Sequence, residues 1–251
     1  MIKPFIKQYN KVREKLHSFK LDTNTPLQRL GSDYGGWFFP KGQINDQSIC
    51  YFAGAGTDVS FDLEMAKHHN PNIYIFDPTP GAITHFNETK DGILSGKTMF
   101  TQGKKYQYPS LSTFDKIHFF DYGIWDKNET LKFYVPANKD FISHSVKNLN
   151  KTSEYFDAKV KTLSTIMAEL GHDHIDLLKI DIEGAEYEVL KDIVTNQIPI
   201  RAICVEFDEN FMKNIDSNYL KRIIAAVQGL KDAGYKLAHV EKPFDMTFIK
   251  E

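Results

Sequence analysis

The chain of 251 residues is long enough for one large α/β domain. A hydrophobic share of 41% can fill a core, a charged share of 25% is ordinary, and a net charge of −2 argues against a nucleic-acid partner. No apolar run reaches the length of a membrane span or a signal peptide, and only two cysteines occur, so we expect a cytoplasmic protein with reduced thiols and no membrane partner.

Residues 1–47 form the first of two predicted units. Apolar side chains recur at helical spacing in their first half, which predicts an amphipathic helix: Phe5, Tyr9, Val12, Leu16 and Phe19. Further on, the run Arg29-Leu-Gly-Ser-Asp-Tyr-Gly-Gly-Trp37 contains a glycine pair that indicates a turn between two extended pieces. This run is either an ordinary turn or a segment that closes a ligand pocket, and the two interpretations stand about level.

Residues 48–251 form the second unit, in which strand and helix patterns alternate. We expect helices at 58–69, 183–195 and 218–232, and strands at 48–53, 72–77, 117–124, 175–182, 200–207, 235–240 and 246–250. The alternation predicts an α/β fold, with a seven-stranded, mostly parallel sheet and helices on both faces.

Two stretches, 81–116 and 126–160, fit the alternation poorly. The first is polar and weakly periodic, and we expect irregular structure there. The second opens with a hairpin turn near Asp126 and a strand near Leu131, and it either carries substrate contacts or is a plain surface insertion.

The first strand of the second unit ends in a Gly-x-Gly turn, Cys50-Tyr-Phe-Ala-Gly-Ala-Gly-Thr-Asp58. Glycine lets a ligand approach the backbone, and the helix that follows offers free N–H groups. The next strand ends at Asp77, where a carboxylate can accept hydrogen bonds from ribose hydroxyls. An NAD site would need a third glycine where Val59 stands, which disfavours an NAD-dependent oxidoreductase without removing it.

A second candidate site lies where the strand 175–182 runs into a helix expected to begin at Glu183. Leu177, Lys179 and Asp181 share one face of this strand, which puts Asp181 at its carboxyl end. Glu183 and Glu186 follow in the first helical turn, so three carboxylates converge on one corner.

The run Lys179-Ile-Asp-Ile-Glu-Gly-Ala-Glu186 closely resembles the signature of the FkbM-like family of S-adenosylmethionine-dependent methyltransferases. Phe76 to Pro80 resembles the second-strand motif of that family, and Arg29 to Trp37 resembles an element found upstream in some members. The resemblance implies a Rossmann-like class I methyltransferase fold over 48–251, preceded by a pocket-closing segment.

The resemblance also implies which residues bind S-adenosylmethionine: Gly54, Ala55, Gly56, Asp58, Phe61, Asp77, Pro78 and Gly123. Gly123 could equally be an ordinary turn glycine. Many methyltransferases carry an acid two residues before the first glycine, and Phe52 stands there. We expect Asp58 to supply that charge instead.

The implied reaction is methyl transfer to a hydroxyl of a sugar, glycan or glycosylated metabolite. A neutral hydroxyl needs a base or a metal. Asp181 is the candidate base, with Glu206 beside it on the next strand, although both could merely cap strand ends. A divalent metal stays open without being favoured, and no metal ligands are assigned. A non-catalytic nucleoside-binding module is the remaining alternative, and the acceptor, the position methylated and the oligomeric state stay undetermined.

Overall fold

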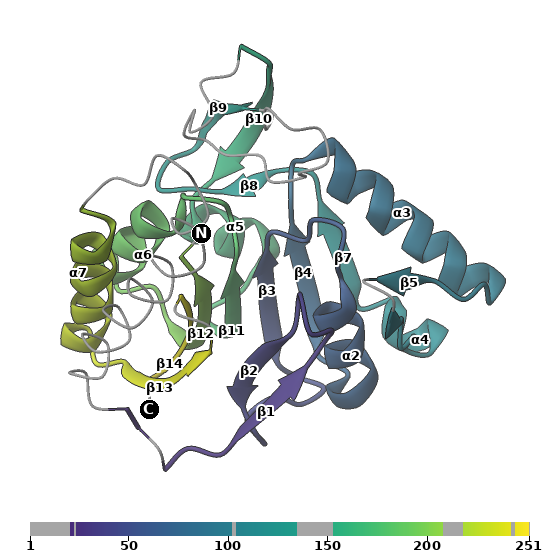
Figure 1. Cartoon of the computed structure of the whole chain (residues 1–251), viewed down its shortest axis with the longest axis horizontal. Coiled ribbons are helices and arrows are strands. Elements are labelled where there is room, and N and C mark those ends of the chain that lie inside the picture. Colours follow the sequence, from purple (N-terminus) through teal and green to yellow (C-terminus); the bar gives the residue numbers. More distant parts are fainter. Residues whose placement is uncertain are drawn as a thin grey trace, which may run out of the picture.

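The computed structural model describes residues 21–22, 24–101, 104–134, 153–207, 218–241 and 244–250. The helix expected near the N-terminus therefore lies outside the described residues. Figure 1 shows the arrangement of the elements.

The centre of the molecule is a seven-stranded sheet. Its order is β13 (Lys236–Glu241), β14 (Asp245–Ile249), β12 (Ile200–Glu206), β11 (Ile175–Ile180), β3 (Ile49–Ala53), β4 (Asn72–Phe76) and β7 (Ile117–Phe120). The pairings from β12 to β7 are parallel, whereas β14 runs antiparallel to both β12 and β13. The sheet is thus mixed, and this mixed α/β architecture fits a methyltransferase-type fold.

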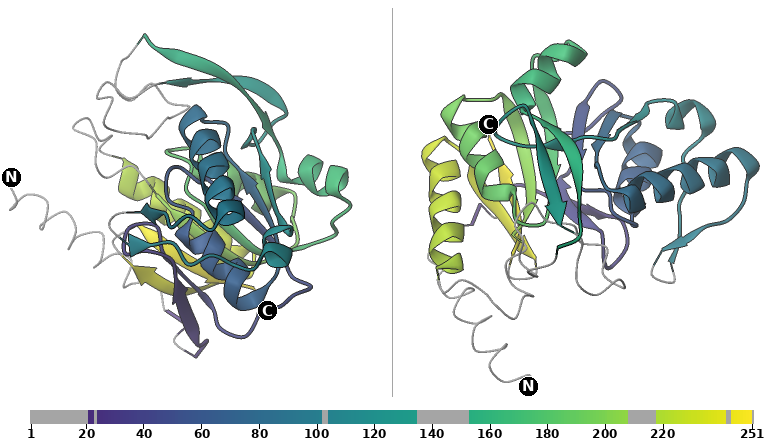
Figure 2. Two further views of the ribbon diagram at one scale, coloured as in Figure 1. Left: turned by 90° about the vertical axis from the view of Figure 1, so that its right-hand side faces the viewer. Right: turned by 90° about the horizontal axis from the view of Figure 1, so that it is seen from above.

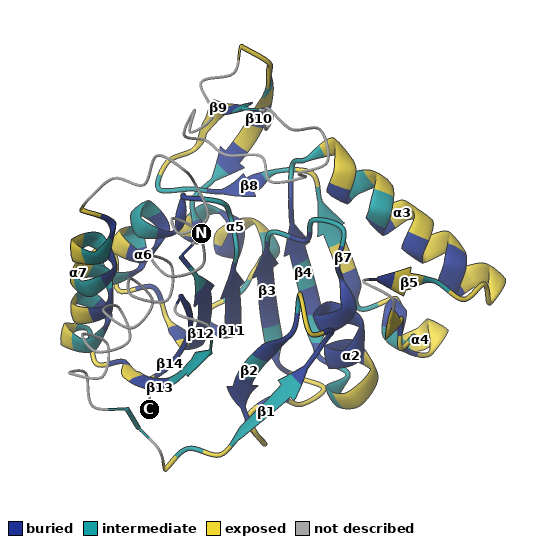
Figure 3. Ribbon diagram, in the orientation of Figure 1, coloured by how far each residue is buried: buried dark blue, intermediate teal, exposed yellow. Residues whose placement is uncertain are grey.

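Helices cover both faces of this sheet (Figure 2). They are α2 (Ser60–His69), α3 (Pro80–Ser95), α4 (Leu111–Phe114), α5 (Leu163–Leu170), α6 (Glu186–Thr195) and α7 (Tyr219–Asp232). Two apolar clusters result: Leu177 of β11 joins the cluster that contains residues of α2, whereas Leu178 and Ile180 join the cluster that contains residues of α6 and α7. Figure 3 shows the consequence, because the central strands are buried while the outer sides of the helices are exposed. The strands read as continuous apolar runs because both faces are covered.

Three smaller sheets surround the central one. β1 (Leu27–Leu30) pairs with β2 (Trp37–Pro40), and β5 (Phe100–Thr101) pairs with β6 (Lys104–Lys105). A three-stranded sheet contains β8 (Gly123–Ile124), β10 (Tyr155–Lys161) and β9 (Glu129–Tyr134), and it lies beyond the central sheet, at the top in Figure 1. β9 confirms the strand expected near Leu131. The hairpin turn expected near Asp126 was wrong, because β8 and β9 on either side of it both pair with β10 and not with each other.

Three further predictions of local structure were wrong. The single strand expected at 117–124 is divided, because the chain leaves the central sheet after Phe120 and then pairs with β10. The stretch 81–116 contains a long helix, α3, because Thr79 caps its first turn and Pro80 fits the first helical position.

The third error concerns the corner after β11. The strand ends at Ile180 and the helix begins only at Glu186. Glu183 and Gly184 have φ values of 53° and 100°, which a right-handed helix does not accept. The residues from Asp181 to Ala185 therefore form a separate turn.

No helix of the described residues is long and apolar enough to cross a membrane.

Candidate functional site

The glycine turn and the carboxylate corner meet at the ends of three adjacent strands. The N–H of Gly54 donates to the carbonyl of Phe76 on β4 (3.0 Å), and the N–H of Asp181 after β11 donates to the carbonyl of Ala53 on β3 (3.1 Å). Gly54 has a φ of 83°, and a Cβ there would collide with the carbonyl oxygen of Asp181. Only glycine fits this position. Because Gly54 and Asp181 lie in contact, the glycine turn and the carboxylate corner form one site.

Asp77 shapes this turn directly. Its Oδ2 accepts from the N–H groups of Ala55 (2.9 Å) and Gly56 (3.0 Å). Its Oδ1 accepts from the N–H and the hydroxyl of Thr79, at 2.8 and 2.6 Å. A carboxylate offers about four acceptor positions, so the protein already uses all of them. The predicted contact of Asp77 with a ribose stays a prediction and would require an exchange of partners.

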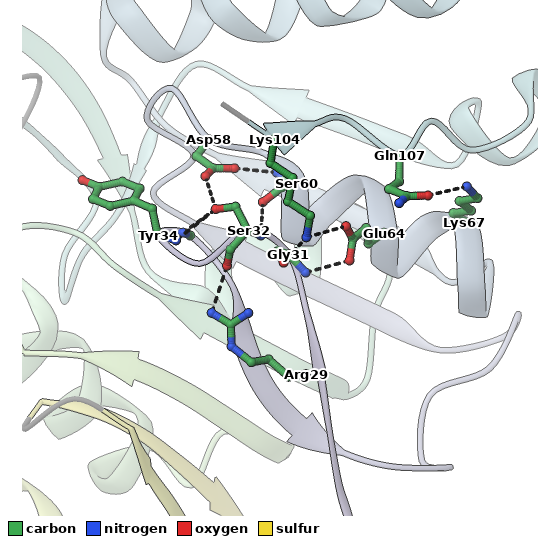
Figure 4. A network of polar contacts seen from close by, with 11 residues as sticks. Arg29, Gly31, Ser32, Tyr34, Asp58, Ser60, Glu64, Lys67, Lys104 and Gln107 are labelled. Carbon is green, nitrogen blue, oxygen red and sulfur yellow. Dashed lines mark hydrogen bonds and ion pairs between the residues drawn. The ribbon is translucent and has the colours of Figure 1, made fainter. Parts of the chain in front are cut away.

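Asp58 connects the turn to the segment 31–36, as Figure 4 shows. Its Oδ2 accepts from the hydroxyl of Ser32 (2.5 Å), and its Oδ1 accepts from the N–H of Ser60 (2.9 Å). The hydroxyl of Ser32 in turn accepts from the N–H groups of Tyr34 (3.2 Å) and Gly35 (2.9 Å). A Cβ on Gly35 would lie 2.9 Å from Cγ of Asp58, so this glycine permits the close approach.

A second set of contacts holds the same segment on α2 (Figure 4). The N–H of Gly31 donates to Oε2 of Glu64 (2.9 Å), and the N–H of Ser32 donates to Oγ of Ser60 (2.7 Å). Lys104 donates to the carbonyl of Gly31 (2.8 Å) and lies 3.4 Å from Glu64. The sequence analysis missed Ser32 and Glu64, although the neighbouring Gly35-Gly36 marked the segment as special.

Three predicted cofactor residues have less direct settings. Pro78 lies beside Gly123, where an added Cβ would be 3.6 Å from Cγ of Pro78. Phe61 is fully buried, with its ring centroid 5.2 Å from that of Phe52 and 6.0 Å from that of Phe39. The ring of Phe61 has no exposed surface, so we assign it to packing beneath the turn. Its contact with a cofactor stays a prediction that this burial does not favour.

The two candidate catalytic carboxylates lie side by side. Ile180 of β11 pairs with Val205 of β12, and Asp181 and Glu206 are the next residues along these parallel strands. Both are partly exposed. Glu206 in turn pairs with Asp245 on β14. The structure therefore brings Asp181 next to the glycine turn on one side and next to Glu206 on the other.

Glu186 is fully buried behind this corner. Its Oε1 accepts from the N–H groups of Ile182 (3.2 Å) and Gly184 (3.0 Å), and these bonds hold the turn that follows β11. Its Oε2 is buried and has no hydrogen-bond partner among the described residues. Burial raises the pKa of Glu186 from 4.5 to about 8, the charges of Asp181 and Glu183 add to the rise, and the backbone hydrogen bonds oppose it. The neutral form of Glu186 is thus favoured at pH 7.

Tyr106 and His85 border the other side of the glycine turn, and the sequence analysis missed both. The hydroxyl of Tyr106 accepts from the N–H of Val59 (3.2 Å) and lies 2.7 Å from Nε2 of His85. Burial raises the pKa of Tyr106 and lowers the pKa of His85, so the neutral form of each is favoured. Within the described ranges, no group of three or more His, Cys, Asp or Glu side chains is placed to hold a metal ion.

A mixed α/β sheet with a glycine turn, an acid and a carboxylate corner at the ends of its central strands fits a methyltransferase-type fold. Residues 40–237 match the family model described as the methyltransferase FkbM domain. This match covers most of the chain, so the protein belongs to the FkbM methyltransferase family, as its signature run indicated. No curated protein and no solved structure gave a match.

Proposed function

We propose that the protein is an S-adenosylmethionine-dependent O-methyltransferase with a Rossmann-like class I sheet. The observation that carries the proposal is the meeting of the Gly54 turn, Asp77 and Asp181 at the ends of three adjacent strands. Open α/β sheets bind nucleoside ligands outside the carboxyl ends of their strands. A cytoplasmic setting suits the two free, buried cysteines.

The corner fits such a cofactor. Gly54 lets the backbone of the turn lie directly against the carbonyl of Asp181, and α2 begins a few residues after the turn. Asp77 accepts hydrogen bonds from the turn and Asp58 follows it, and Pro78 and Gly123 flank the end of β4. When bound, S-adenosylmethionine supplies an activated methyl group on a cationic sulfonium.

The chain's own part of the reaction is to hold the acceptor and remove its proton. Asp181 lies at the edge of the glycine turn and Glu206 is its neighbour, so either carboxylate can take the proton from a hydroxyl in line with the methyl group. Glu186 is unsuited to this role, because its raised pKa keeps it protonated at pH 7. We assign the base to Asp181.

The acceptor that we propose is a sugar, glycan or glycosylated metabolite. Tyr34 supports this choice, because it is 62% exposed on the segment that Ser32 and Asp58 hold against the turn. An exposed aromatic ring of this kind offers a flat apolar face with a polar end.

The first test is calorimetric titration with S-adenosylmethionine, S-adenosylhomocysteine and NAD. We expect micromolar binding of the first two, which corresponds to about −8 kcal/mol, and none of NAD. Asp77→Ala should abolish binding, whereas Asp91→Ala on the exposed side of α3 should not. Binding of NAD alone would favour the oxidoreductase, and binding without methyl transfer to any sugar would favour a binding module.

The base is tested by activity on an accepted sugar. Asp181→Asn should lower kcat by about 100-fold or more while cofactor affinity changes little, because a general base contributes on the order of 10²–10⁴. If Glu206→Gln lowers kcat by about 100-fold and Asp181→Asn leaves kcat unchanged, the general base is Glu206 instead of Asp181. Activity that a chelator removes and magnesium restores would add a metal to the site.

A further inference from the structure

A pair of ionisable side chains, one basic and one acidic, is buried near the glycine turn, and no step of the proposed reaction uses it. The pair consists of Lys179 on β11 and Asp62 in the first turn of α2. Lys179 is only 3% exposed and Asp62 only 1% exposed. Buried charges are costly unless they are paired and hydrogen-bonded, so their presence calls for a function.

Lys179 makes a specific contact with the turn. Its Nζ donates to the carbonyl oxygen of Gly54 at 2.7 Å. On the neighbouring strands its register partners are Phe52 and Cys204, and neither supplies a negative charge.

Asp62, on α2, is a buried acid whose ionisation Lys179 influences. Neither of its carboxylate oxygens has a hydrogen-bond partner among the described residues. Burial raises the pKa of Asp62, the charge of Lys179 opposes that rise, and the charge of Asp58 adds to it. Lys179 is thus the cation that acts on this carboxyl.

The contact with Gly54 fixes one end of a single peptide group. The carbonyl of Gly54 and the N–H of Ala55 belong to the same planar unit and point in opposite directions. Lys179 holds the carbonyl, and Asp77 holds the N–H at 2.9 Å. Because glycine permits many backbone conformations, this peptide could rotate if either end were released.

We propose that Lys179 is a positioning residue that locks the Gly54–Ala55 peptide in the orientation needed for cofactor binding. The inference rests on the proposed function, in which this turn receives S-adenosylmethionine. It assigns Lys179 a role through Gly54 and no contact with the reacting atoms.

The test separates stability from positioning. Lys179→Met leaves Asp62 buried without its cation and should lower Tm by about 10 °C or more. In the double variant Lys179→Met/Asp62→Asn both ionisable groups are gone, so most of the decrease in Tm seen in Lys179→Met should be reversed. The affinity for S-adenosylhomocysteine should nevertheless stay about 10- to 100-fold below that of the wild type, because the bond from a charged donor to Gly54 is still absent. Lys161→Met, which breaks a surface pair with Glu169, should leave affinity unchanged.

Hydrogen exchange of the Ala55 amide in the ligand-free protein gives a second readout, and it should quicken in the double variant. A double variant that regains stability, binds S-adenosylhomocysteine within about twofold of the wild type and protects Ala55 normally would overturn the inference. If the wild type binds no S-adenosylhomocysteine, the proposed function fails, and exchange at Ala55 still decides the role of Lys179. If the Met variants do not fold, Lys179→Arg keeps the charge while moving the donor, and a loss of affinity at unchanged Tm supports positioning.

Discussion

Glu186→Gln tests whether a neutral acid supports the catalytic corner. The folded protein holds the pKa of Glu186 at about 8, whereas the ordinary value is 4.5. Between these values the folded state keeps a proton that the unfolded state has lost, so stability falls by about 1.4 kcal/mol for each rising pH unit. The stability contributed by the protonated group is complete below pH 4.5 and is lost as pH rises through 8. Between pH 6 and pH 8, the ionisation of Glu186 should therefore lower the free energy of unfolding of the wild type by about 2 kcal/mol.

Glutamine keeps the acceptor for Ile182 and Gly184 but cannot ionise, so the variant should lack this loss. For a chain of this size, about 2 kcal/mol corresponds to a Tm difference of about 5 °C. The assay is thermal unfolding of both proteins at pH 6, 7 and 8, in which other titrating groups cancel between them. Glu129→Gln, at an exposed position on β9, should follow the wild type. Parallel curves for wild type and Glu186→Gln would refute the reasoning.

Three further substitutions address the turn and its supports. Gly54→Ala should abolish S-adenosylhomocysteine binding and lower Tm, whereas Gly42→Ala, with a similar φ of 78° but open space around it, should cost only the backbone strain of about 1–2 kcal/mol. Ser32→Ala removes a hydroxyl that hydrogen-bonds Asp58, Tyr34 and Gly35, so the free energy of unfolding should fall by about 1–3 kcal/mol and the affinity for the cofactor should fall too. Ser95→Ala, whose hydroxyl bonds only within α3, should change neither quantity. Tyr106→Phe should leave the N–H of Val59 without its acceptor and weaken cofactor binding. Tyr108→Phe should not weaken binding, because the hydroxyl of Tyr108 donates to the exposed carbonyl of Lys97. Equal cofactor affinities of the wild type and Tyr106→Phe would show that Tyr106 contributes only packing.

The parts of the fold that the sequence predicted are those with a strong local signal. The runs that became β3, β11 and β12 are mostly apolar because most of their residues are buried, and their boundaries came out within two residues. The family followed from an unbroken eight-residue run. The helix α3 was missed because its buried side chains, Ala82, Phe86, Thr89 and Ile93, are mixed with polar and glycine residues that weaken the periodicity.

What the sequence could not predict depends on contacts between distant residues. Ser32 hydrogen-bonds Asp58, which lies 26 positions later in the sequence, and Lys179 hydrogen-bonds Gly54, which lies 125 positions earlier. No periodicity links such pairs, so their function is visible only in three dimensions. The turn at Asp181 to Ala185 was missed for a different reason, since Glu183 adopts a left-handed φ that favours glycine or asparagine.

The two acids at the glycine turn differ in the acceptor capacity that they have left. Asp77 already accepts four hydrogen bonds, two from the turn and two from Thr79, whereas Asp58 accepts one on each oxygen. A ligand donor can therefore add to Asp58 without breaking a contact, but it must displace a donor from Asp77. The hydroxyl of Thr79 can rotate away and the backbone donors of the turn cannot, so Thr79→Val should tighten cofactor binding if Asp77 takes the ribose. Because Thr79 also caps α3, Tm is measured alongside, and unchanged binding in a Thr79→Val variant of unchanged Tm would place the ligand's hydrogen bonds on Asp58 instead.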